Sequence, residues 1–147
     1  MKGFLLFLSM LVAIGGIAQK KSVTILIDPG HGGKDPGHLP LKDTLMQEKD
    51  IALKIALKVG HYLTYNLSNV NVIYTRTADV YPTLDQRVDQ ANNNNVDYMI
   101  SLHVNGSPNP AISGTETHIH NYDAKSSYKW ATLIEDQFEK RAGRKSR

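Results

Sequence analysis

Hydrophobic and polar residues change their spacing several times along the chain, and each change predicts a different element. Residues 23–27 are all apolar or β-branched and are followed by Asp28-Pro29-Gly30, which is typical of a strand buried on both faces that ends in a turn. Residues 70–75 predict a second strand and 115–119 predict a further one. Between them, residues 98–104 alternate apolar and polar side chains, which favours a half-buried strand.

Helical spacing separates these strands. Ile51, Ile55, Val59 and Leu63 recur every four residues after Glu48, so we expect an amphipathic helix with these residues on its apolar face.

Two more helices complete the pattern. Thr83 and Gln86 have the spacing of a capping box, which predicts a helix that runs to about residue 91. Apolar residues at helical intervals predict a last helix over 126–140. Strands that alternate with helices predict an α/β fold with a mostly parallel twisted sheet and helices on both faces.

The first 18 residues have the pattern of a signal peptide. Lys2 precedes an apolar run, and small residues up to Ala18 come before polar residues. The run is shorter than the about 20 apolar residues of a membrane-spanning helix. We therefore expect residues 1–18 to be a cleaved signal peptide, with no stable membrane span afterwards and a periplasmic or extracellular location. The alternative is an uncleaved anchor.

The charge pattern argues against nucleic-acid binding. The chain has 17 basic and 14 acidic residues and a formal net charge of +3, but Lys2 and five residues of the last eight are basic. Without these six, 11 basic residues remain against the 14 acidic ones, so no basic face is indicated. Because the chain has no cysteine, histidine and carboxylate side chains would have to hold any metal ion.

Three residues combine into a candidate metal site. His31 follows the first predicted strand, and His103 lies at the end of the alternating one, so parallel strands would bring both to one edge of the sheet. Glu48 begins the first helix in line with its apolar stripe, where an unpaired carboxylate is costly. Two histidines and a glutamate are a ligand set of catalytic zinc, although each residue alone has an ordinary structural explanation.

Local motifs give this site its specificity. The segment 27–37, Ile-Asp-Pro-Gly-His-Gly-Gly-Lys-Asp-Pro-Gly, resembles the opening motif of the zinc-dependent N-acetylmuramoyl-L-alanine amidases. Further similar segments follow in the same order as in that family, and they cover nearly everything from residue 23 onward. They are Glu-Lys-Asp-Ile-Ala-Leu at 48–53, Thr-Arg at 75–76, Leu-Asp-Gln-Arg-Val at 84–88, Ala-Asn at 91–92, Ile-Ser-Leu-His-Val-Asn at 100–105 and Gly-Thr-Glu-Thr at 114–117.

The resemblance implies a role for each candidate. The family's zinc ligands fall on His31, Glu48 and His103, and the implied reaction is hydrolysis of the amide between N-acetylmuramic acid and L-alanine in peptidoglycan. Ser101 and Asn105 share the His103 face of the predicted strand and are candidates for orienting ligands or substrate. Asp28 is expected to order its own loop.

One part of the family pattern has no counterpart among the residues. The family uses a second glutamate as general base, and Glu116, Glu135 and Glu139 are poor matches for it in position. We therefore expect residues 19–147 to be an amidase catalytic domain cut short at its C-terminus, with an incomplete sheet and the general base beyond residue 147. Losing this group typically costs about 10²–10⁴ in rate.

Several alternatives remain open. His118 and His120 share one face of a predicted strand and are either extra ligands or, more simply, surface residues. A zinc- and peptidoglycan-binding fragment without turnover would carry the same ligands, as would a zinc peptidase or deacetylase acting on the same polymer. The simplest alternative is an exported α/β domain with coincidental histidines. Regulatory partners and oligomeric state leave no pattern in the sequence.

Overall fold

The structure is a computed structural model that describes residues 21–40, 42, 44–107, 109 and 111–147. The predicted signal peptide over 1–18 lies outside the described residues. The chain divides into two compact units, one that ends at Val104 and one that runs from Asn105 to Arg147. Within the described ranges, no helix has both the length and the hydropathy that a membrane span requires.

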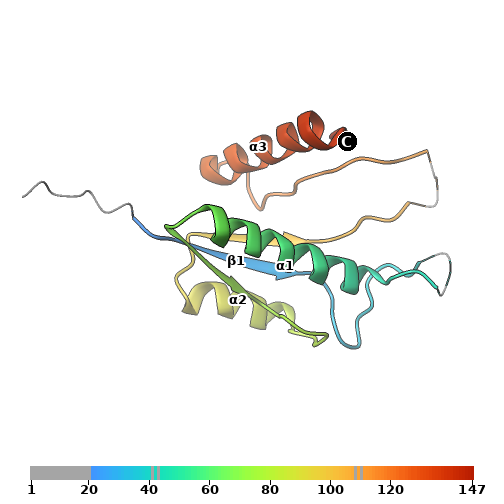
Figure 1. The fold of residues 1–147 in the computed structure, drawn as a ribbon, viewed down its shortest axis with the longest axis horizontal. Helices are drawn as coiled ribbons and strands as arrows, with labels where there is room; N and C mark the ends of the chain where they lie inside the picture. Colours follow the sequence, from blue (N-terminus) through green and yellow to red (C-terminus); the bar gives the residue numbers. More distant parts are fainter. Residues whose placement is uncertain (1–20, 41, 43, 108, 110) are drawn as a thin grey trace, which may run out of the picture. The chain divides into compact units, whose positions relative to one another are not determined.

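The first unit is a three-stranded parallel sheet with two helices (Figure 1). Its elements in chain order are β1 (Val23–Pro29), α1 (Glu48–Asn66), β2 (Val70–Tyr74), α2 (Leu84–Asn93) and β3 (Tyr98–Leu102). The sheet has the order β2-β1-β3, and β1 pairs in parallel with both neighbours. The predicted α/β fold with a parallel sheet is therefore confirmed.

Helix α1 packs on one face of the sheet through its smallest residues. Ala52, Ala56 and Gly60 are buried at four-residue intervals, in line with Glu48 at the start of the helix. A Cβ atom at Gly60 would lie 2.6 Å from the Tyr74 ring, so only glycine permits this approach to β2.

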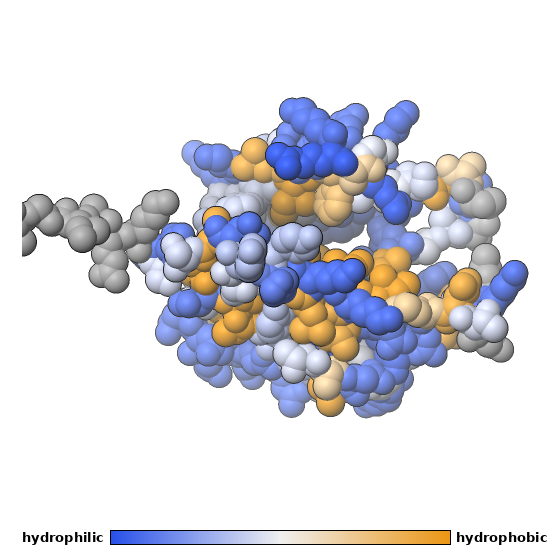
Figure 2. Space-filling view, in the orientation of Figure 1, coloured by the Kyte–Doolittle hydropathy of each residue, from blue (hydrophilic) through white to orange (hydrophobic). Residues whose placement is uncertain are grey.

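The predicted apolar stripe of α1 needs a correction. Val59 and Leu63 pack against the core of Ile25, Ile27 and Ala56 as expected, but Ile55 is 43% exposed. The helix turns its row of small residues toward the sheet in place of the predicted row of large ones. Small side chains bring the helix axis closer to the sheet than large ones would. Apolar side chains therefore remain on the visible surface around α1 (Figure 2).

The face of β1 that points away from α1 carries both an apolar and a charged residue. Leu26 and Asp28 alternate with Ile25 and Ile27 and are at most 3% exposed. Arg87 of α2 forms an ion pair with Asp28, so α1 and α2 lie on opposite sides of β1 (Figure 1). The sheet of the first unit therefore has a helix on each side, as predicted.

Helix α2 begins as its sequence predicts. The Thr83 side chain accepts a hydrogen bond from the Gln86 backbone, and the Gln86 side chain accepts one from the Thr83 backbone. Both halves of the capping box are present, which satisfies two backbone N–H groups at the helix start.

The second unit contains one long helix, α3 (Lys125–Ala142), which ends at Gly143 in the left-handed conformation. The predicted strand over 115–119 is wrong. Thr115 forms only an isolated bridge with Ser146, while the side chains of Thr115 and Thr117 bind Glu135 of α3. A strand needs a paired neighbour along its length, and within the described part of this unit the partner is only a short terminal tail.

Candidate metal centre

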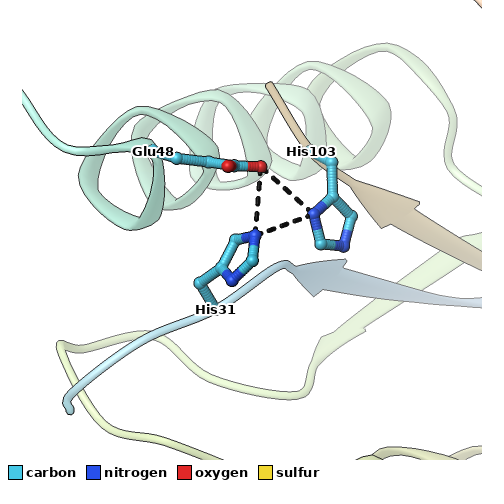
Figure 3. A group of neighbouring side chains, drawn as sticks. All are labelled: His31, Glu48 and His103. Carbon is cyan, nitrogen blue, oxygen red and sulfur yellow. Dashed lines mark hydrogen bonds and ion pairs between the residues drawn. The ribbon is translucent and has the colours of Figure 1, made fainter. Parts of the chain in front are cut away.

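Three side chains from separate elements meet at the carboxyl end of the sheet (Figure 3). His31 lies just beyond β1, Glu48 is the first residue of α1, and His103 follows β3 directly. Glu48 Oε1 lies 3.1 Å from His31 Nε2 and 3.2 Å from His103 Nδ1. The two histidine nitrogens are 3.1 Å apart. The structure therefore brings all three sequence-predicted ligand candidates together.

A strained backbone and a buried guanidinium direct His31 into the cluster. His31 has φ of 61°, a left-handed conformation that is uncommon outside glycine. Arg87 Nη2 donates to the His31 carbonyl at 2.9 Å and Nη1 donates to the Pro29 carbonyl at 3.0 Å. These two bonds hold the peptide groups on both sides of the turn and stabilise a conformation that the backbone alone disfavours.

A second buried arginine holds the same loop from the β2 side. Arg76 is 3% exposed, and its guanidinium donates to the carbonyls of Pro29, Gly30 and Lys49 at 2.8–3.0 Å. The loop after β1 is thereby tied to the first turn of α1, which carries Glu48. Burial and the neighbouring Arg87 lower the pKa of Arg76 from its usual value.

Two glycines leave the space that the cluster occupies. A Cβ atom at Gly30 would lie 2.6 Å from His103 Nε2. A Cβ atom at Gly37 would lie 2.6 Å from His31 Cδ2 and 2.8 Å from Glu48 Oε2, and Gly37 has a positive φ of 68°. The glycines of the 27–37 motif therefore admit the imidazole and carboxylate groups at short range.

Glu48 is buried and ionised. Its side chain is 7% exposed, Oε2 accepts the His38 N–H and Oε1 accepts the Val104 N–H, both at 2.8 Å. Burial acts to raise the pKa of Glu48, but the two backbone donors, with His31 and His103, outweigh it and lower the pKa below the usual 4.5. The carboxylate therefore carries its charge into the cluster at neutral pH.

The donor atoms fit a metal ion. Asp35 Oδ2 lies 2.8 Å from His31 Nδ1, and because an ionised carboxylate only accepts, Nδ1 of the neutral ring carries the hydrogen. His31 Nε2 then presents a lone pair to a Glu48 oxygen 3.1 Å away, an arrangement that requires a cation or a proton between them. Ligands about 2.0–2.2 Å from zinc in tetrahedral geometry are about 3.3–3.5 Å apart, close to the spacing found here.

Asp35 belongs to the site, although its position in the sequence predicts no role for it. It lies in the opening motif four residues after His31, in a loop without periodic spacing that would predict their contact. The hydrogen bond from His31, followed by the one from the Gly37 N–H, lowers the pKa of Asp35 below its usual value. The available signal was the acidic residue itself, in a glycine-rich loop next to a candidate ligand.

The other candidate polar residues have different partners. The Ser101 hydroxyl donates to Asp28 Oδ2 at 2.6 Å, and Asn105 donates to Glu116. Asp28 also accepts from Thr75, so it joins β1 to its neighbours and does more than order its own loop. A role for Ser101 or Asn105 in orienting ligands or substrate stays a prediction.

Two histidines outside the cluster lie in the second unit. His118 Nε2 is 3.7 Å from Glu116 Oε2, and its side chain is 84% exposed. His120 is also exposed. Among the described residues, the one group of three or more histidine, aspartate or glutamate side chains that could hold a metal ion is His31, Glu48 and His103.

Comparison with known sequences gives a consistent result. Residues 25–147 match the N-acetylmuramoyl-L-alanine amidase family. The sporulation-specific N-acetylmuramoyl-L-alanine amidase of Bacillus subtilis is 40% identical over 98 residues, which are 67% of this chain and 36% of that protein. A putative N-acetylmuramoyl-L-alanine amidase of Buchnera aphidicola is 33% identical over 132 residues and is covered over 54% of its length. The chain thus spans about a third to a half of these relatives.

Solved structures share the fold. The catalytic domain of the amidase CwlV from Bacillus (Paenibacillus) polymyxa superposes with a TM-score of 0.75 at 33% identity, covering 85% of this chain and 67% of that one. The amidase AmiC2 of Nostoc punctiforme gives a TM-score of 0.74 at 31% identity, covering 85% and 66%. By its motifs, its parallel sheet and the match over residues 25–147, the chain belongs to the N-acetylmuramoyl-L-alanine amidase family.

Proposed function

We propose that residues 19–147 form the metal-binding part of a zinc-dependent hydrolase. Its reaction is cleavage of the amide between N-acetylmuramic acid and L-alanine in peptidoglycan. The observation that supports it best is the convergence of His31, Glu48 and His103, whose ligand atoms all lie within 4.8 Å of one another. Family membership supports the amide bond and the polymer as the substrate.

The donor set favours zinc. Two imidazole nitrogens and one carboxylate are a common protein ligand set of catalytic zinc, and they leave one coordination position open. Zinc held in this way supplies Lewis acidity, which acidifies water and polarises a carbonyl oxygen. The His103 side chain is 49% exposed, so solvent reaches this side of the cluster.

The chain's own residues contribute position and charge. Glu48 brings one negative charge, fixed by two backbone N–H groups before any metal arrives. The buried arginines fix the loop that bears His31, so this ligand needs little reorganisation on binding. A preformed site of this kind raises metal affinity because less conformational entropy is lost when the ion binds.

A second candidate is zinc and peptidoglycan binding without turnover. It is favoured by the state of the carboxylates beside the histidines: both Glu48 oxygens accept backbone N–H groups, and Asp35 accepts from His31 and Gly37. Neither carboxylate is free to act as a general base for water. Turnover would then need a general base from another part of the protein.

Hydrolysis of a purified muropeptide by the full chain tests the first candidate. We expect only slow release of the stem peptide with a free L-alanine amino group, about 10²–10⁴ below the rate of an amidase that has its general base, with loss after removal of metal by a chelator and return with zinc. His103→Ala should abolish the reaction, while His61→Ala, an exposed residue of α1, serves as the matched control. Turnover that survives chelation would contradict the proposal.

Binding without turnover gives a different result in the same experiment. Zinc would bind to the full chain and the muropeptide would be retained, for example in a sedimentation assay with insoluble peptidoglycan, but no stem peptide would be released. Failure of both zinc binding and peptidoglycan binding would contradict both candidates.

We also propose that the protein is exported to the periplasm or cell wall. The apolar run before Ala18, with Lys2 ahead of it, supports a signal peptide over residues 1–18. N-terminal sequencing of the protein from the cell exterior or periplasm should give a start near Gln19. Recovery of uncleaved protein from the cytoplasm alone would contradict export.

A further inference from the structure

The two ring nitrogens of His31 face two different carboxylates. Nδ1 lies 2.8 Å from Asp35 Oδ2, whereas Nε2 lies 3.1 Å from Glu48 Oε1 and 3.1 Å from His103 Nδ1. Only Nε2 therefore faces the other candidate ligands (Figure 3). The orientation and tautomer of this ring decide whether the cluster can bind a metal ion.

Hydrogen bonds to both of its oxygens fix the Asp35 side chain. Oδ1 accepts the Gly37 backbone N–H at 3.1 Å, which leaves Oδ2 directed at the His31 ring. A carboxylate has no hydrogen to donate, so Nδ1 must carry a hydrogen toward Asp35, and a metal ion on the other side of the ring would take the place of a hydrogen on Nε2. The lone pair on Nε2 then points into the cluster.

From this geometry, we propose that Asp35 is a positioning residue that holds His31 in the Nδ1–H tautomer, so that Nε2 is available to a metal ion. The inference deepens the proposed zinc site and rests on it. Hydrogen bonding from a carboxylate also increases the basicity of the imidazole and fixes the plane of its ring.

A purely structural role for Asp35 would make a different prediction. If the residue served only to shape the turn through Gly37, then Asp35→Asn would preserve its function, because the Asn Oδ1 atom accepts the same N–H. The amide NH₂ would then face His31 Nδ1 and donate to it. This reverses the tautomer and places the hydrogen on Nε2, where it blocks the metal.

The tautomer can be observed without metal. In the metal-free full chain, long-range ¹H–¹⁵N spectra should show a hydrogen on Nδ1 of His31, with the signal assigned by its absence in His31→Ala. In Asp35→Asn, Nδ1 should carry no hydrogen. A hydrogen on Nδ1 in both proteins, or none on Nδ1 in the unsubstituted chain, would overturn the inference.

Zinc affinity provides the second readout. Asp35→Asn should bind zinc about 10- to 100-fold more weakly than the unsubstituted chain, as is typical when an outer hydrogen-bond partner of a ligand is lost. Asp79→Asn is the matched control, because Asp79 accepts from the Gly33 N–H and from Lys49 in the same region but does not contact His31. We expect the control to bind within about threefold of the unsubstituted chain.

The outcomes separate this inference from the proposed function. If the unsubstituted chain binds no zinc, the proposed site fails and Asp35 cannot have the assigned role. If it binds zinc and Asp35→Asn binds equally well with the same thermal unfolding temperature, the site stands and the inference is overturned. If Asp35→Asn proves unstable, the tautomer in the unsubstituted chain still decides.

Discussion

At the scale of single residues, the sequence identifies the cluster but not the groups that orient it. His31, Glu48 and His103 stand in ordered motifs, and strand polarity predicts that the two histidines share an edge of the sheet. The contact between Asp35 and His31 depends on a left-handed turn in a loop without periodicity, and local spacing does not predict such a turn. The sequence does not predict the backbone N–H groups that donate to Glu48, for the same reason.

Gly30 gives a prediction at this scale. Gly30→Ala introduces a methyl group where the His103 ring now lies, so the ring must leave its present position beside Glu48 and His31. We expect zinc affinity to fall about 10- to 100-fold, as for the loss of an orienting contact, although all three ligands remain. A competition titration with a chromophoric chelator measures it.

Gly143→Ala is the corresponding control. A Cβ atom at Gly143 would meet nothing within 4 Å, and this glycine lies in the second unit at the end of α3. The substitution is strained by its positive φ but leaves the ligands untouched, so zinc affinity should not change. Equal affinities for the Gly30 and Gly143 variants would contradict the packing argument.

At the scale of elements, hydrophobic spacing predicts those elements that bury a face. The three strands of the sheet and all three helices match the predicted segments to within a few residues. The segment 115–119 has the composition of a strand but lacks a neighbour to pair with along its length, and composition does not report the partner. The exposure of Ile55 has a similar origin, because the close approach of Gly60 to Tyr74 sets the rotation of α1.

Arg87 connects α2 to the loop that carries His31, so its substitution should lower the stability of the fold. Arg87→Leu leaves Asp28 buried without its ion-pair partner and removes two bonds to loop carbonyls. Removing one partner of a buried pair typically costs about 3–5 kcal/mol. Urea unfolding of the metal-free protein should show a loss of this order.

The double variant Asp28→Asn/Arg87→Leu separates the charge from the packing. Because it no longer buries an unpaired carboxylate, its loss of stability should be smaller than the sum of the two single losses. Additive losses would show that the ion pair is not the reason for the stabilisation.

At the scale of the whole molecule, charge and composition exclude functions more readily than they assign them. The basic residues collect at the chain end, which argues against nucleic-acid binding, while the proposed zinc site consists of only three residues in 147. Motif order, and not composition, is what predicts the family. The division into two units at Val104 is followed directly by a segment rich in glycine, proline and serine over residues 105–114, a composition that often accompanies such a boundary.

Acid should destabilise the metal-free protein. Three solvent-accessible carboxylates have pKa values below their usual ones, first because of hydrogen bonds from cationic side chains: Asp79 with Lys49, Glu116 with Arg147 and Asp136 with Lys140. A carboxyl group with a lowered pKa in the folded state stabilises it above its unfolded pKa, and this contribution is lost as the pH falls. The usual values of 3.8 and 4.5 place the loss below about pH 4.5.

Urea unfolding in the presence of a chelator measures this effect. The midpoint should be nearly constant between pH 6 and 5 and should fall from about pH 4.5 to 3. Because solvent reaches all three pairs, about 0.5 M salt should reduce the difference. A midpoint that rises on acidification would contradict the assigned ion pairs.

The most direct test of the central claim is the zinc content of the purified full chain and its ligand variants. We expect about one zinc ion per chain by elemental analysis after dialysis, and the same for the control His61→Ala. His31→Ala, Glu48→Gln and His103→Ala should each retain little or none. A metal-free unsubstituted chain, or variants that keep a full equivalent of zinc, would contradict the claim that these three side chains form one metal site.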